Sequence, residues 1–170
     1  MADEEASHPS QIDRYADMPA DTPTRAGIPL GMLRAMVIAN ESKSTADARG
    51  VSPYDVMAIG PGVVHNAQTA PTDEMGFPSR APVLGAWGVP SQGAGAFQFE
   101  KELWHDVAKQ IGPLPDFGQR SQDAVFNYVV TGNMAGKSGF FPWEKNFRLA
   151  PTVRWLQNYY GSKKTGSAGR

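Results

Sequence analysis

The feature that most constrains the fold is residues 63–96, which lack helical periodicity and divide the chain into two parts. This stretch is rich in Gly, Pro, Thr, Ser and Asn, a composition that favours a long loop with short strands. Before it, apolar residues recur with helical spacing, and after it several helical patterns follow one another. This order predicts an α+β protein that is mainly helical, with a small antiparallel β region.

The first predicted helix begins near Pro29, ends near residues 42–44 and carries Leu30, Leu33 and Val37 on one face. Residues 52–62 predict a strand closed by a turn. Three helices are predicted after the long loop: the first over 99–111, the second from Ser121 as N-cap to residue 132, and the third over 153–160.

Composition and charge restrict the class of protein. The chain has 170 residues, 41% hydrophobic and 19% charged, which fits one soluble domain with tails. Residues 1–24 carry a net charge of −5 and the remainder +4. We therefore expect a flexible acidic tail over 1–25, a domain over 26–161 and a flexible tail over 162–170.

Several functional classes are not supported by the sequence. The absence of cysteine excludes disulfides and thiolate metal sites. No apolar run is long enough to span a bilayer, and the polar N-terminus does not read as a secretory signal. A charge of +4 without a basic run interleaved with aromatics does not indicate nucleic-acid binding. His65 and His105 lack metal-ligand spacing, so no metal site is predicted.

Glu41 continues the apolar stripe of the first predicted helix and lies in its last turn. Partial burial and the negative end of the helix dipole both disfavour an ionised carboxylate. A carboxylic acid that stays protonated near neutral pH can protonate the leaving oxygen of a glycosidic bond. A solvated glutamate at a frayed helix end is the alternative interpretation.

A second stretch, "SQGAGAFQFE" (91–100), places a loop of small residues before the next helix, with Gln98 near its end. Small residues let the backbone approach a ligand closely, and a glutamine offers both a donor and an acceptor to the amides and hydroxyls of N-acetylated sugars. The alternative interpretation of these residues is a tight turn that places Phe97 and Phe99 in the core.

Together, "ANES" (39–42) and "SQGAGAFQF" (91–99) resemble the lytic transglycosylase and lysozyme superfamily, and in particular the lambda-type phage endolysins. Further matches are "YDV" (54–56), Trp104 and "SQDAV" (121–125). The resemblance covers most of residues 28–160. It departs at 63–90, at 134–150 and at Phe97, where the family usually has Tyr.

The resemblance implies a lysozyme-like fold and cleavage of the β-1,4 bond between N-acetylmuramic acid and N-acetylglucosamine in peptidoglycan. Glu41 would act as acid and base while the C6 hydroxyl of the muramic acid attacks its own C1, giving a 1,6-anhydro product without any cofactor. The implied partner is the glycan strand, reached in the periplasm from the bacterial host cytoplasm by holin-dependent release or from a virion.

Residues expected to contact the substrate lie in both motifs, in the predicted strand at 52–62 and in the long loop: Ser42, Tyr54, Trp87, Ser91 and Gln98. The other tryptophans are expected in the core: Trp104, Trp143 and Trp155.

Two alternatives stay open from the sequence. A muramidase that adds water needs a second carboxylate, for which Asp55, Asp73 and Glu74 are the candidates. Of these, Asp55 is more readily explained as a structural residue. A module that binds the cell wall without cutting it is the non-enzymatic alternative.

Overall fold

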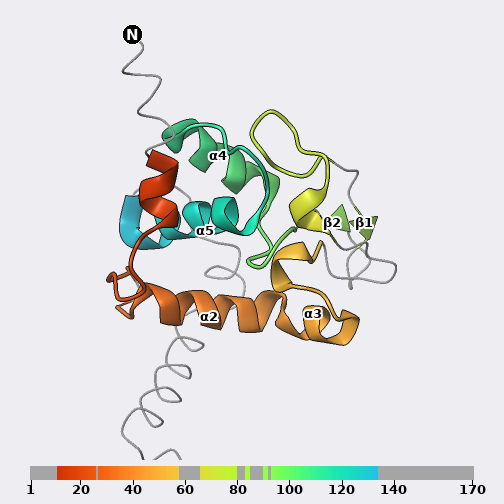
Figure 1. Ribbon diagram of the computed structural model, residues 1–170, viewed down its shortest axis with the longest axis horizontal. Coiled ribbons are helices and arrows are strands. Elements are labelled where there is room, and N and C mark those ends of the chain that lie inside the picture. The colour runs from red at the N-terminus through yellow and green to blue at the C-terminus, as the bar shows by residue number, and fades with distance from the viewer. Residues whose placement is uncertain are drawn as a thin grey trace, which may run out of the picture.

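The computed structural model describes residues 11–25, 27–57, 66–79, 83–84, 90–91 and 93–133. After a helical turn over 11–16, the elements follow in the order of Figure 1. They are α2 (Leu30–Glu41), α3 (Lys43–Arg49), the 3₁₀ turns η1 (Pro53–Asp55) and η2 (Ala67–Thr69), β1 (Val83–Leu84), β2 (Pro90–Ser91), α4 (Lys101–Ile111), α5 (Gln119–Tyr128) and the π-helical turn η3 (Val129–Asn133). The predicted helix over 153–160, the tail over 162–170, Trp143 and Trp155 lie outside the described residues.

The described part of the chain is mainly helical, as predicted. Its sheet is the antiparallel pair β1–β2, with Val83 opposite Ser91 and Leu84 opposite Pro90. The strand predicted at 52–62 is wrong for residues 53–55, which form η1. Ser52 caps this turn by accepting a hydrogen bond from the Tyr54 N–H, and Pro53 fixes a helical φ at its start.

The helix predicted from Pro29 to residues 42–44 is confirmed as α2, with Pro29 as its N-cap. Leu30, Leu33 and Val37 are each at most 1% exposed, so the stripe faces the core as expected. The short helix α3 was not predicted from the sequence. It buries only Ala46 and ends at Gly50, whose φ of +68° is a left-handed C-cap, so it has no apolar stripe to detect.

Helix α5 lies at the centre of the view in Figure 1, between α2 and α4, and seven of its ten residues are buried. Ser121 was expected as its N-cap, but the helix begins two residues earlier and Gly118 is the cap. Two other side chains supply oxygens at this end of the helix. Asp116 Oδ1 accepts hydrogen bonds from the Gly118 N–H and the Ser121 hydroxyl, and Gln68 Oε1 accepts from the Gln119 N–H, each at 2.9 Å.

An aromatic cluster fills the space between α4, α5 and the 93–99 segment. Phe97 stacks on Phe126 at 4.2 Å between ring centroids, and Trp104 contacts Phe117 at 4.7 Å. Phe97, Phe99 and Trp104 are at most 1% exposed, which confirms their predicted place in the core. Because such rings bury large apolar areas, this cluster anchors the 93–99 segment firmly.

Residues 11–25 pack against the domain, so the prediction of a flexible tail through residue 25 is wrong for them. Tyr15 is 7% exposed and its ring meets Tyr128 edge-on at 5.0 Å. The buried Asn127 amide donates to the Tyr15 carbonyl at 2.7 Å. Arg120 bridges Asp13 and Asp17 at the surface, which places the acidic residues of this segment beside a basic one.

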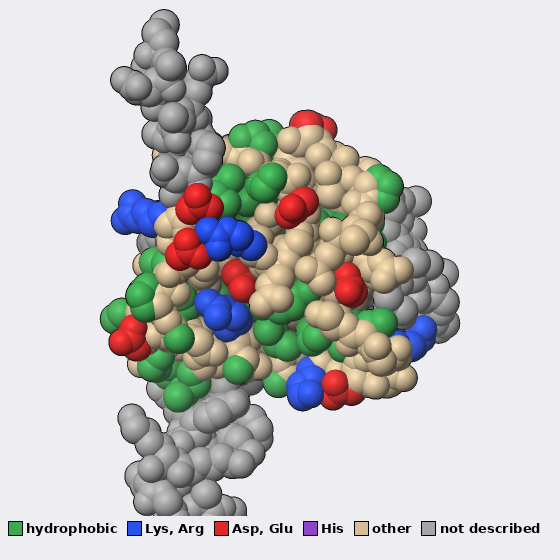
Figure 2. Space-filling model, viewed as in Figure 1, with side chains coloured by type: hydrophobic (Ala, Val, Ile, Leu, Met, Phe, Trp, Pro, Cys, Tyr) green, Lys and Arg blue, Asp and Glu red, His purple; other side chains and the backbone are tan. Residues whose placement is uncertain are grey.

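Charges on the visible face of the domain are mixed. In Figure 2, acidic and basic side chains lie among one another over the described residues, and neither sign gathers into a large patch. Within the described part of the chain, no helix has the length and apolar content needed to cross a bilayer.

Candidate functional site

Glu41 is the last residue of α2 and is 9% exposed. Burial raises the pKa of its carboxyl to about 7. Among the described residues, no hydrogen bond or ion pair reaches this carboxyl, and no basic residue lies in the last turn of α2. The group is therefore a buried acid that changes protonation near neutral pH, as the apolar stripe predicted.

Ser42 joins the two sequence motifs in space. Its hydroxyl donates to the carbonyl of Ala96 at 2.8 Å, and its side chain is almost fully buried. The end of α2 and the glycine-containing loop therefore touch directly, although 54 positions separate the two residues. Ser42 was expected to contact substrate, but its hydroxyl proton is donated in the hydrogen bond to the Ala96 carbonyl.

The small-residue loop is a tight turn closed by reciprocal backbone hydrogen bonds between Ala94 and Phe99. Gly95 within it has a φ of +82°, and its N–H donates to the Val56 carbonyl at 2.6 Å. A Cβ at this position would collide with the Gln122 side-chain oxygen. The loop therefore needs glycine both for its backbone conformation and for close packing against Gln122 of α5.

Gln98 uses its amide to hold this turn. Its Nε2 donates to the carbonyls of Met57 at 3.0 Å and Gly95 at 2.9 Å, which occupies both amide N–H groups. Its φ of +51° is a left-handed conformation that such contacts stabilise. The expectation that Gln98 donates to a sugar is not supported by this arrangement.

Tyr54 was expected to line a cleft, but it lies in the interior. It is 8% exposed and its hydroxyl donates to Asp123 Oδ1 at 2.7 Å. Asp123 also faces Arg34 of α2, with 3.8 Å between Oδ1 and Nε. Burial raises the pKa of Asp123, although its interactions with Tyr54, Arg34 and Gln119 oppose the shift. This network ties η1 and α2 to α5.

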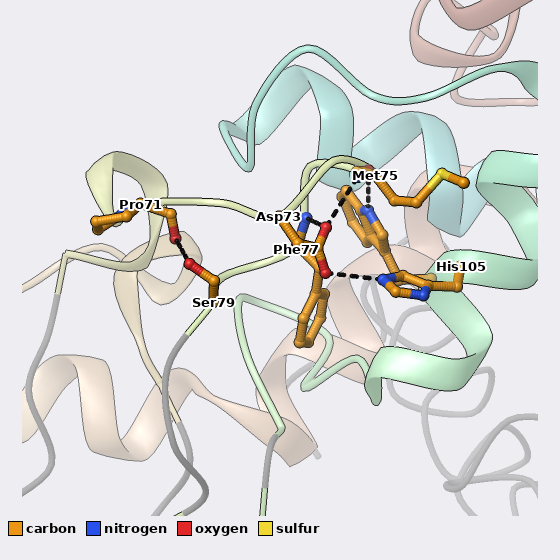
Figure 3. A network of polar contacts seen from close by, with 7 residues as sticks. Pro71, Asp73, Met75, Phe77, Ser79 and His105 are labelled. Atoms are coloured by element: carbon orange, nitrogen blue, oxygen red, sulfur yellow. Dashed lines mark hydrogen bonds and ion pairs between the residues drawn. The ribbon is translucent and has the colours of Figure 1, made fainter.

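Two of the three candidate second carboxylates have structural partners. Asp55 Oδ1 accepts a hydrogen bond from the Gln68 N–H at 3.1 Å and so links η1 to η2. Glu74 is exposed. Asp73 organises the loop drawn in Figure 3, where its Oδ1 accepts from the backbone N–H groups of Met75 and Phe77.

The other carboxylate oxygen of Asp73 meets His105 Nε2 of α4 at 2.8 Å (Figure 3). Burial alone would raise the pKa of Asp73, but the hydrogen bonds from His105 and the backbone outweigh it and hold the pKa below its usual value. Trp104 donates to the Met75 carbonyl at 2.8 Å and adds a second tie between this loop and α4. Asp73 therefore holds a loop in place.

Two residues expected to contact the substrate are described partly or not at all. Trp87 lies outside the described residues, and for Ser91 only the backbone, in β2, is described. Over the part of the chain that the structure describes, no group of three or more potential metal ligands comes together.

Gln122 is a residue of the site that was not predicted from the sequence, where it was noted only as part of the motif "SQDAV" (121–125). It is fully buried and hydrogen-bonds three backbone groups, those of Ala96, Tyr54 and Phe117. In sequence it shares the helical face of Val125, Phe126 and Val129, so a polar residue on an apolar stripe was the available indication. The same pattern identified Glu41.

We compared the chain with models of known protein families, with curated proteins and with solved structures, and none of these comparisons gives a match.

Proposed function

We propose that this protein cleaves the β-1,4 bond between N-acetylmuramic acid and N-acetylglucosamine in peptidoglycan, with Glu41 as the general acid. The observation that carries the proposal is the buried Glu41 carboxyl at the end of α2, whose pKa is about 7. An acid of this strength is protonated in a large fraction of molecules at neutral pH and still transfers its proton readily.

The reaction requires one carboxyl group in two roles. Glu41 donates its proton to the glycosidic oxygen as the bond to C1 of the muramic acid breaks. The C6 hydroxyl of the same sugar then forms a bond to C1 and returns its proton to the Glu41 carboxylate. The product is a 1,6-anhydro sugar, the acid is regenerated, and the nucleophile benefits from being part of the same molecule.

The contacts of the other carboxylates favour this one-carboxyl chemistry over hydrolysis. Hydrolases of this type use a pair of carboxylates placed on either side of the scissile bond. Asp55 accepts a hydrogen bond from the Gln68 N–H of η2, and Asp73 accepts from backbone N–H groups of its own loop. Burial rather than a neighbouring charge raises the pKa of Glu41. No described carboxylate is electrostatically paired with Glu41.

The test is digestion of purified peptidoglycan by the wild type, Glu41→Gln and Glu100→Gln, with soluble products identified by mass spectrometry. Glu100 is a matched control, because it is also a partly buried glutamate with a pKa raised by burial, at the N-cap of α4. We expect anhydro-muropeptides from the wild type and Glu100→Gln, and none from Glu41→Gln.

Other outcomes would contradict the proposal in distinct ways. Reducing-end products, heavier by one water, would make the protein a muramidase. No release by any of the three proteins, combined with sedimentation of the wild type with peptidoglycan, would indicate a wall-binding module. Activity retained in Glu41→Gln would remove Glu41 from the mechanism.

A further inference from the structure

Residue 96 of the glycine-containing turn is held at both of its backbone polar groups. Its N–H donates to Gln122 Oε1 at 2.9 Å, and its carbonyl accepts the Ser42 hydroxyl at 2.8 Å. All three residues are at most 2% exposed, so water does not compete for these bonds. Ala96 and its two hydrogen bonds thus connect Gln122 of α5 to Ser42, the residue that follows Glu41.

Gln122 is itself fixed in one orientation. Its Nε2 donates to the carbonyls of Tyr54 at 3.0 Å and Phe117 at 2.8 Å, so both amide N–H groups are used and the oxygen must face residue 96. Gly95 packs against the same amide too closely to admit a Cβ. Gln122 therefore fixes residue 96 within the turn, whereas the Gly95–Val56 hydrogen bond and the stacking of Phe97 on Phe126 hold its neighbours.

We propose that Gln122 is a positioning residue for Glu41, acting through Ala96 and Ser42 to fix the last turn of α2 in the place where Glu41 is buried. The catalytic consequence rests on the proposed function, whereas the structural link does not. Loss of the Gln122 amide leaves the Ala96 N–H without its acceptor, and the Ala96 carbonyl then becomes a less fixed acceptor for the Ser42 hydroxyl. The end of α2 gains freedom, and water gains access to the Glu41 carboxyl.

The experiment compares Gln122→Met, which keeps similar volume but removes all three bonds, with Ser42→Ala, which removes only the final one. Asn127→Leu is the matched control on the same helix. Asn127 is an equally buried amide that bonds the Tyr15 carbonyl and Arg34, in the middle of α2, but not residue 96.

The first readout is the titration of the Glu41 carboxyl by carbon-13 NMR, assigned by difference from Glu41→Gln and measured without substrate. We expect Gln122→Met and Ser42→Ala to lower the pKa of Glu41 by about 1, toward the value of a solvated glutamate. Asn127→Leu is expected to lower the thermal unfolding temperature without moving this titration.

The second readout is peptidoglycan release as a function of pH. In Gln122→Met and Ser42→Ala we expect kcat near pH 7 to fall about tenfold with little change in KM, and the descending limb of the pH profile to move to lower pH. Ser42→Ala keeps the test decisive if Gln122→Met does not fold.

An unchanged Glu41 titration in Ser42→Ala or in folded Gln122→Met would overturn the inference, as would an equal shift in Asn127→Leu. Because the NMR titration needs no substrate, it tests the inference even when peptidoglycan is not cleaved. Lack of activity in the wild type would count against the proposed function alone.

Discussion

At the scale of single residues, burial of Glu41 should make the protein less stable in the pH range where the acid works. The folded-state pKa of about 7 lies above the value of 4.5 for an exposed glutamate. The stabilisation from the protonated form is fully present below pH 4.5 and is lost as the pH rises through 7. We predict that Glu41→Gln exceeds the wild type in free energy of unfolding by about 1–3 kcal/mol at pH 8, and by almost nothing at pH 4.

Urea denaturation at the two pH values measures this difference. Glu74→Gln, at an exposed glutamate, controls for the loss of one negative charge and should show no such dependence on pH. A pH-independent effect of Glu41→Gln would mean that the carboxyl is solvated in the folded protein. The catalytic proposal would then lose its main support.

At the scale of elements, the turn over 94–99 depends on Gly95. Alanine there would adopt a left-handed φ and also collide with Gln122, so we predict that Gly95→Ala lowers the free energy of unfolding by about 2–4 kcal/mol. Gly50→Ala is the matched control. Gly50 also has a positive φ, but a Cβ there would meet no atom within 4 Å, so we expect a loss of only about 1 kcal/mol.

Equal losses in the two glycine variants, measured by urea denaturation, would show that backbone conformation alone requires Gly95. A larger loss for Gly95→Ala would establish that the turn is packed tightly on Gln122. That packing is what the positioning role of Gln122 requires.

The helices and turns also show which features of the fold can be predicted from the sequence. The α2 stripe and Glu41 were predictable because helical periodicity is a local property of neighbouring residues. Helix α3 was missed because it buries only Ala46. The true partners of Tyr54 and Gln98 were not predictable, because Asp123 and Met57 lie far away in sequence and only the folded chain brings them close.

At the scale of the whole molecule, the segment over residues 11–25 forms part of the domain. Its composition suggested a flexible tail, because it is acidic and contains few apolar residues. The segment nevertheless supplies one aromatic ring and one backbone carbonyl to buried partners on α5. These two contacts join residues more than a hundred positions apart, so no local sequence pattern predicts them.

The role of this segment is testable by a single substitution. Tyr15→Ala removes a 7%-exposed ring from its edge-on contact with Tyr128, and we predict a loss of about 2–4 kcal/mol in the free energy of unfolding. Arg120→Gln breaks the exposed pairs with Asp13 and Asp17 on the same segment and should leave the thermal unfolding temperature almost unchanged, because water screens such pairs. A flexible tail predicts no effect of either change. A loss from Tyr15→Ala alone would show that buried aromatic packing, and not surface charge, holds the N-terminal segment beside the helix that carries Gln122.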